Sequence, residues 1–249
     1  MVYLITNEEI KSRARKVFET NRKLLYKSAA IYFAFYIILF SITLSINEKH
    51  ENLSSGINTI GGFLIFPILF ANIATIASIY LKKDQQIGSF SFYKNGNFFK
   101  IFLTTFLPSF YVFLWILPVS TAAVISLLFS ERIIFFILGI LLIIGMIILC
   151  IYKSLQYSLT PYIVAANEEI TPQDALNESI RLTKGNVGKL FLLNLSFIGW
   201  IFLVPFTLGF LLIWLIPYYN TTLFQYYLSL EQDKEEEMQG LDSNVNELN

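Results

Sequence analysis

The longest charge-free run in the chain is the feature that most constrains its fold. No Asp, Glu, Lys or Arg occurs in the 41 residues of Leu190–Leu230, and a second charge-free run covers Ile101–Ser130. A small soluble domain has too little interior to bury such runs, whereas about 20 apolar residues cross a bilayer. Hydrophobic residues make up 55% of the chain and charged residues 14%, against roughly 25% charged residues in soluble domains. The sequence therefore predicts an all-α, polytopic membrane protein.

The apolar segments predict about six transmembrane helices. As one helix, Leu190–Leu230 would be about 60 Å long, twice the roughly 30 Å hydrocarbon core. It is therefore predicted to fold back at Thr207–Gly209, just after Pro205. Pro108 and Pro118 are predicted to kink the third span. The predicted spans are 28–46, 57–81, 101–129, 133–152, 190–206 and 210–228.

The distribution of basic residues predicts the orientation. With six spans, 16 of the 18 Lys and Arg residues fall on one side of the membrane, and only Lys49 and Arg132 fall on the other. Cytoplasmic segments carry the excess of Lys and Arg. Both termini are therefore expected in the cytoplasm, with the chain in the plasma membrane. No cleavable signal peptide is expected, because the first 23 residues are polar and charged.

Two cytoplasmic segments and the tail have their own patterns. Residues 1–27 are predicted to hold a basic amphipathic helix, opened by a Thr6–Glu9 capping box. It either lies on anionic headgroups or is a solvated helix leading into the first span. A second helix, 172–184, has Thr171 as N-cap and is expected on the membrane surface or the base of the bundle. The acidic tail, 231–249, has no periodic apolar face and is predicted to be disordered.

A weak internal repeat accompanies the hairpins. Three times a cytoplasmic segment ends in Asn, one or two further residues, a base and an apolar span, at Asn21–Leu24, Asn97–Ile101 and Asn186–Leu190. The chain is then three copies of a surface helix plus a hairpin. Chance also produces such a pattern in a chain with many Asn and Lys residues, so both interpretations stay open.

The sequence lacks the motifs and charged residues that are typical of catalytic sites. The predicted spans hold essentially no charged residue, and metalloprotease, hydrolase and phosphate-loop motifs are not found. The single Cys150 and single His50 cannot form a standard zinc site or a disulfide. We therefore expect no catalytic residue, no metal, no cofactor and no enzymatic activity. The formal net charge of +0 does not indicate a nucleic-acid partner, and none is expected.

Uncharged polar residues form the candidate site. Asn72 and Asn220 lie in spans that run in the same direction, each predicted about 15 Å from the cytoplasmic face. Thr75 and Thr221 follow them, and Asn194 lies nearer the cytoplasm. Such residues either hydrogen-bond helices together or line a small polar pocket for a headgroup or substrate.

Several short motifs between residues 157 and 230 carry a resemblance to a known family. They are Tyr157–Ile163, Ala175-Leu176, Ser179, Thr183–Gly185, Leu192–Trp200, Thr207–Gly209, Trp214–Tyr218, Thr221-Thr222 and Phe224–Tyr226. The chain resembles the bacterial integral membrane proteins of domain of unknown function 975. More distantly, it is similar to the membrane domain of some glycerophosphodiester phosphodiesterases. The resemblance implies a six-helix membrane protein of a Gram-positive type of bacterium, with no established activity and, at most, proximity to lipid.

Since no enzymatic activity is expected, two other functions are the main hypotheses. The first is a non-enzymatic protein that binds a lipid or a protein partner, as an accessory or immunity-like subunit or a homo-oligomer. The second is a small transporter or channel-like protein that moves an uncharged or lipidic substrate through the region of Asn72 and Asn220. An exposed apolar groove favours the first hypothesis, and a continuous cavity that reaches one face favours the second.

Overall fold

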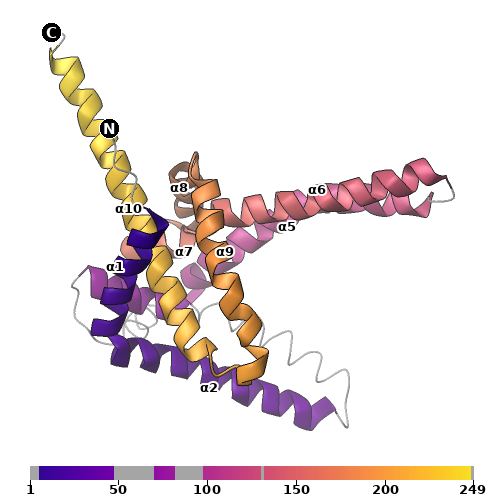
Figure 1. The fold of residues 1–249 in the computed structure, drawn as a ribbon, viewed down its shortest axis with the longest axis horizontal. Helices are drawn as coiled ribbons and strands as arrows, with labels where there is room; N and C mark the ends of the chain where they lie inside the picture. Colours follow the sequence, from indigo (N-terminus) through magenta and orange to yellow (C-terminus); the bar gives the residue numbers. More distant parts are fainter. Residues whose placement is uncertain (1–5, 48–69, 82–97, 130–131, 248–249) are drawn as a thin grey trace.

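The computed structural model describes residues 6–47, 70–81, 98–129 and 132–247, and all regular structure within them is helical (Figure 1). This confirms the predicted all-α class. Residues 57–69 of the second predicted span, and His50, lie outside the described residues. The helices are α1 (Asn7–Thr20), α2 (Arg22–Asn47), an unlabelled helix over Phe70–Tyr80, α5 (Phe98–Leu128), α6 (Ile133–Tyr157), α7 (Thr160–Ala166), α8 (Pro172–Thr183), α9 (Val187–Leu203), the short 3-10 helix η1 (Pro205–Thr207) and α10 (Leu212–Glu247).

Local sequence rules place the helix boundaries. The Thr6 hydroxyl accepts the Glu9 backbone N–H at 3.3 Å and starts α1, while Thr171 accepts the Asp174 N–H at 3.1 Å and starts α8. The predicted N-cap at Thr171 is therefore confirmed, and so is the Thr6 half of the capping box, while the Glu9 carboxylate accepts from Arg13 at 2.7 Å. The predicted turn after Pro205 is confirmed as well, because η1 ends at Thr207 and the next two residues, Leu208 and Gly209, have φ of 50° and 84°. Pro108 and Pro118 both lie inside the single helix α5.

Within the part of the chain that the structure describes, two long helices are apolar enough to cross a membrane. They are Phe99–Leu128 and Ile133–Ala166, and a third candidate is the pair α8 and α9, which bends by 96°. The described residues thus support membrane localisation with two or three candidate spans, fewer than the six predicted. The three-repeat hypothesis stays a prediction, because residues 82–97, which hold the start of the second copy, lie outside the described part.

The apolar face of α1 packs against α10 rather than standing free for lipid. Ile10, Ala14 and Phe18 are at most 5% exposed, and Phe18 meets the rings of Trp214 and Tyr218 at 6.5 and 5.8 Å. A helix can bury its apolar stripe in lipid or in protein, and the sequence pattern is the same for both. The expectation that this face lies on the membrane is therefore corrected, while Arg13, Arg15 and Lys16 of α1 are exposed.

The junction between α6 and α7 is held by α8. The Ser179 hydroxyl accepts the Leu159 N–H at 3.2 Å and donates to the Gln156 carbonyl oxygen at 2.7 Å. These two backbone groups lie where the helical hydrogen-bond pattern changes, and Ser179 is fully buried. The amphipathic helix predicted over 172–184 thus packs on the bundle, one of its two expected positions.

The predicted disordered tail is corrected by the extent of α10. This helix continues beyond Leu230 to Glu247. Residues 231–247 contain no Pro and a single Gly, and they include five Glu and two Gln residues, which favour helix. In addition, the Lys234 ammonium donates to the Arg181 carbonyl oxygen at the end of α8. The acidic residues and the lack of an apolar face therefore do not prevent this segment from continuing the helix that begins at Leu212.

Candidate functional site

The structure brings the two predicted amides together. The Asn220 side-chain N–H donates to the Asn72 side-chain oxygen at 3.0 Å. The Asn220 oxygen in turn accepts from the Tyr162 hydroxyl at 2.8 Å, and the Asn72 N–H donates to the Ser28 hydroxyl at 2.7 Å. The Ser28 hydroxyl in turn donates to the Leu25 carbonyl oxygen at 2.8 Å. One buried network therefore joins α2, the Phe70–Tyr80 helix, α7 and α10.

This network uses both polar groups of each amide within the protein. Buried polar groups are costly when they lack a partner, and a satisfied chain of them fixes the position of the helices that carry it. Asn72 and Asn220 are 2% and 7% exposed, so little of either side chain is available to a ligand. The geometry thus favours the structural interpretation of these two residues over the pocket.

The other three predicted residues lie apart from the network. Thr75 and Thr221 donate within their own helices, to the carbonyl oxygens of Ala71 at 2.9 Å and Pro217 at 2.7 Å. Asn194 donates to the Leu190 carbonyl oxygen at 2.7 Å and accepts from Tyr219 at 2.5 Å. The five predicted residues thus divide into one interhelical pair, two threonines bonded along their own helices and one separate amide.

Sequence reasoning missed Ser28 and Tyr162. Tyr162 lies on α7, in a segment predicted to be cytoplasmic, although α7 is largely buried. The short apolar run around Pro161, directly before Asn167, was the available signal. The Ser28 contact also changes the depth of Asn72. If the first span begins at Ser28, as predicted, its partner Asn72 lies level with that boundary rather than about 15 Å inside.

An apolar groove opens between α6, α9 and α10. Its volume is about 520 Å³, and its lining includes Cys150 and Ile151 of α6, Ile198 of α9 and Leu215 of α10. Its polar lining residues include Ser154 and the hydrogen-bonded pair of Asn194 and Tyr219. Cys150 is partly buried in this wall. A hydrocarbon chain matches this lining.

A second cavity combines aromatic rings with basic side chains. We call it the basic-aromatic pocket; its volume is about 530 Å³, and it lies between α1, the start of α2, α9 and α10. Its rings form a continuous wall, since Trp214 stacks on Tyr218 at 5.1 Å and meets Trp200 at 5.1 Å. The lining residues are Lys11, Arg15, Phe18, Glu19, Arg22, Tyr26, Phe197, Trp200, Trp214 and Tyr218.

Positive charge predominates in this pocket. Three cations, Lys11, Arg15 and Arg22, face one carboxylate, Glu19, and Arg15 pairs with Glu19 at 2.8 Å. The Lys11 ammonium lies 4.9 Å from the centre of the Phe197 ring. Burial lowers the pKa of Lys11 from its ordinary value, because it removes water from the charged form. An anion in the pocket would replace that water and stabilise the charged ammonium.

Comparison with known proteins identifies the family. A family model described as "Protein of unknown function (DUF975)" matches residues 1–234. The chain belongs to the DUF975 family. All the motifs that carried the resemblance lie within the match, as do both cavities. No curated protein and no solved structure matches the chain. The more distant similarity to glycerophosphodiester phosphodiesterases is not shown by these comparisons.

In this DUF975 protein, α1 lies along the α9–α10 hairpin from its base toward its tip. Asn7 donates to the Lys189 carbonyl oxygen at 3.1 Å at the base, and the pocket reaches Trp200, 11 residues further along α9. Eleven residues of helix span about 17 Å. If α9 crossed the bilayer from Leu190, the charges of the pocket would lie near its centre, at about 2.5–3.5 kcal/mol for each charge. A position of the pocket near a membrane surface would avoid this cost.

Proposed function

We propose that this protein is a non-enzymatic, multi-pass protein of the bacterial plasma membrane that binds the headgroup of an anionic lipid. The observation that carries the proposal is the basic-aromatic pocket, which combines an excess of cations with tryptophan and tyrosine rings. Anionic headgroups attract Lys and Arg side chains at the cytoplasmic leaflet. Trp and Tyr concentrate at the same level of a membrane protein. Both properties of the pocket fit a phosphate group at the interface.

The charge distribution of the chain supports a cytoplasmic position for this pocket. The basic residues before Ile31, three of which line the pocket, belong to the 16 that the positive-inside rule assigns to the cytoplasm. Both termini are then cytoplasmic. A lipid-bound protein of this kind acts as an accessory or immunity-like subunit, alone or with a protein partner.

Thermal unfolding in detergent, with lipid added, tests the headgroup proposal. Phosphatidylglycerol should raise the unfolding temperature of the purified protein, and phosphatidylcholine with the same acyl chains should not. The Lys11→Gln/Arg22→Gln double variant should lose most of this stabilisation, and high salt should weaken it. Lys16→Gln is the matched control, because Lys16 is exposed on the same helix and does not line the pocket. Equal stabilisation by both lipids, or equal losses in variant and control, would contradict the proposal.

The second candidate function, a transporter for an uncharged or lipidic substrate, has one supporting observation. The apolar groove lies beside the basic-aromatic pocket, and Phe197 lines both. A lipid that places its headgroup in the pocket and a chain in the groove would pass Phe197. Lipid exchange between the leaflets of proteoliposomes distinguishes the two functions. A transporter accelerates this exchange and is slowed by Phe197→Trp, whereas a binding protein leaves the rate unchanged.

A further inference from the structure

The tip of the α9–α10 hairpin presents a dense group of exposed apolar side chains. Phe202, Phe206, Leu208 and Phe210 are 71%, 85%, 84% and 61% exposed. No Asp, Glu, Lys or Arg lies between them. Aromatic and aliphatic side chains exposed together in this way mark a surface that contacts a partner or lipid.

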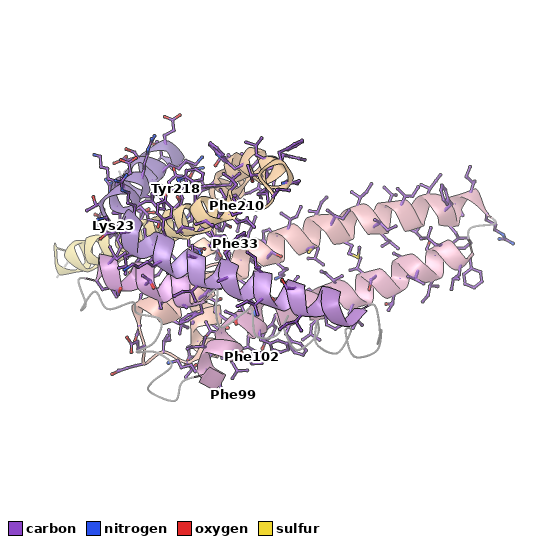
Figure 2. The ribbon with its side chains drawn as sticks, turned by 90° about the horizontal axis from the view of Figure 1, so that it is seen from below. Lys23, Phe33, Phe99, Phe102, Phe210 and Tyr218 are labelled. Carbon is purple, nitrogen blue, oxygen red and sulfur yellow. The ribbon has the colours of Figure 1, made fainter. Side chains whose placement is uncertain are left out.

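The hairpin does not run in the direction of the other long apolar helices. In Figure 1, α2, α5 and α6 all extend toward the same side of the molecule, and α9 and α10 cross that direction. Figure 2 shows α2, α5 and α6 extending together again in a view turned by 90°. If α2, α5 and α6 cross the bilayer, the α9–α10 hairpin therefore lies obliquely to the bilayer normal.

A contact with α2 gives the depth of the hairpin tip. The rings of Phe33 and Phe210 lie 5.7 Å apart, and both are labelled in Figure 2. Phe33 comes five residues after Ser28, the first residue of the first predicted span. Five residues of helix correspond to about 8 Å. The tip thus lies within a single leaflet, well short of the opposite face of a roughly 30 Å core.

The charged residues of α1, which packs along the hairpin, also indicate a shallow position for the tip. Lys11 and Arg15 lie against the wall formed by Trp200 and Trp214. Charged side chains belong near headgroups, and Trp concentrates at that level. The tip residues, 201–210, lie between these two tryptophans in the sequence. The exposed apolar side chains of the tip therefore adjoin a pair of tryptophans, as expected for a surface that contacts acyl chains next to the interfacial level where Trp concentrates.

We propose that the α9–α10 hairpin does not cross the membrane and that its tip, 201–210, inserts among the acyl chains of the cytoplasmic leaflet. The occupant of this apolar surface is the lipid of that leaflet. Four of the predicted spans then remain, and both termini still lie on one side. The distribution of bases does not conflict with this arrangement, because Leu190–Leu230 carries no charge and returns to the side from which it starts. The inference is independent of which headgroup the basic-aromatic pocket binds.

A fluorescent label at the tip tests this depth in lipid nanodiscs, whose two faces both contact the buffer. Phe206→Cys, in a variant that lacks Cys150, carries the label, and Leu208→Cys provides a second position. Arg132→Cys, at the exposed turn between α5 and α6, is the reference for a tip in water. We expect nitroxide-labelled lipid to quench both tip labels several-fold more than it quenches the reference. Iodide in the buffer should quench only the reference strongly.

Iodide quenching of both tip labels at the level of the reference would overturn the proposal, because a crossing hairpin exposes its tip to water. Nitroxides at carbon 5 and carbon 12 of the acyl chain then give the depth. Stronger quenching by the carbon-5 lipid is expected for a shallow tip, whereas no quenching by either lipid would also contradict insertion. The lipid titration of Lys11 and Arg22 variants reports on the headgroup pocket separately, so the two proposals fail independently.

Discussion

Asn220 and Asn72 are joined directly by a hydrogen bond of 3.0 Å between side chains that are 148 residues apart in the sequence. Each amide also has a second side-chain partner, Tyr162 for Asn220 and Ser28 for Asn72. Four helices therefore meet at one short chain of polar groups. The position of each helix depends on the others through this chain.

Replacing either amide should destabilise the fold, and the two effects should be coupled. Asn72→Leu and Asn220→Leu should each cost about 0.6–2 kcal/mol, the range measured for hydrogen bonds between membrane helices. The double variant should lose less than the sum, because either single change already removes the shared hydrogen bond. Thermal unfolding in detergent of the unaltered protein, the two single variants and the double variant measures this coupling as a double-mutant cycle. Strict additivity would show that the amides do not act together.

Ser179 provides a second test of a buried polar contact. At the junction of α6 and α7, Ser179→Ala removes the partner of the Leu159 N–H and the shorter hydrogen bond to the Gln156 carbonyl oxygen, which retains the Thr183 hydroxyl at 3.5 Å. An unsatisfied buried group costs about 1–3 kcal/mol, so the unfolding temperature should fall clearly. Ser196→Ala is the control, because Ser196 is exposed and bonds only within α9. Similar, small shifts for both variants would mean that the junction does not need the serine.

Local signals in the sequence were sufficient for the helix starts at Thr6 and Thr171 and for the turn after Pro205. In each case, a few neighbouring residues determine the geometry. The pairing of Asn72 with Asn220 could also be anticipated, because an amide in an apolar span needs a polar partner at similar depth. These features depend on short-range chemistry or on a strong energetic requirement.

The direction of an apolar face could not be obtained in the same way. The stripe through Ile10 and Phe18 is equally consistent with lipid and with the side of α10, since both are apolar. Tyr162 was missed because α7 has only seven residues, too few for a periodic pattern to be recognised. The hairpin over 190–230 has the composition of two spans whether it crosses the bilayer or enters one leaflet. In all three cases, the arrangement depends on contacts between segments that are distant in the sequence.

The orientation of the chain is open to direct labelling. In a variant that lacks Cys150, Ser54→Cys should react with a membrane-impermeant thiol reagent added to intact cells. Asn177→Cys, on the exposed face of α8, should react only after the cells are permeabilised. The reason is the distribution of Lys and Arg, of which 16 of 18 fall on the predicted cytoplasmic side. The opposite labelling pattern would reverse the topology and place the basic-aromatic pocket outside the cell.

The packing of α5 on α6 depends on a glycine at a close approach. A Cβ atom added at Gly139 would lie 2.7 Å from the Leu127 side chain, whereas one added at Gly145 would meet nothing within 4 Å. Small residues let membrane helices approach each other, and overpacking costs about 1–3 kcal/mol. Gly139→Leu should therefore lower the unfolding temperature in detergent, while the matched change Gly145→Leu on the same helix should not. If both variants unfold at the temperature of the unaltered protein, the close approach of the two helices is not needed for stability.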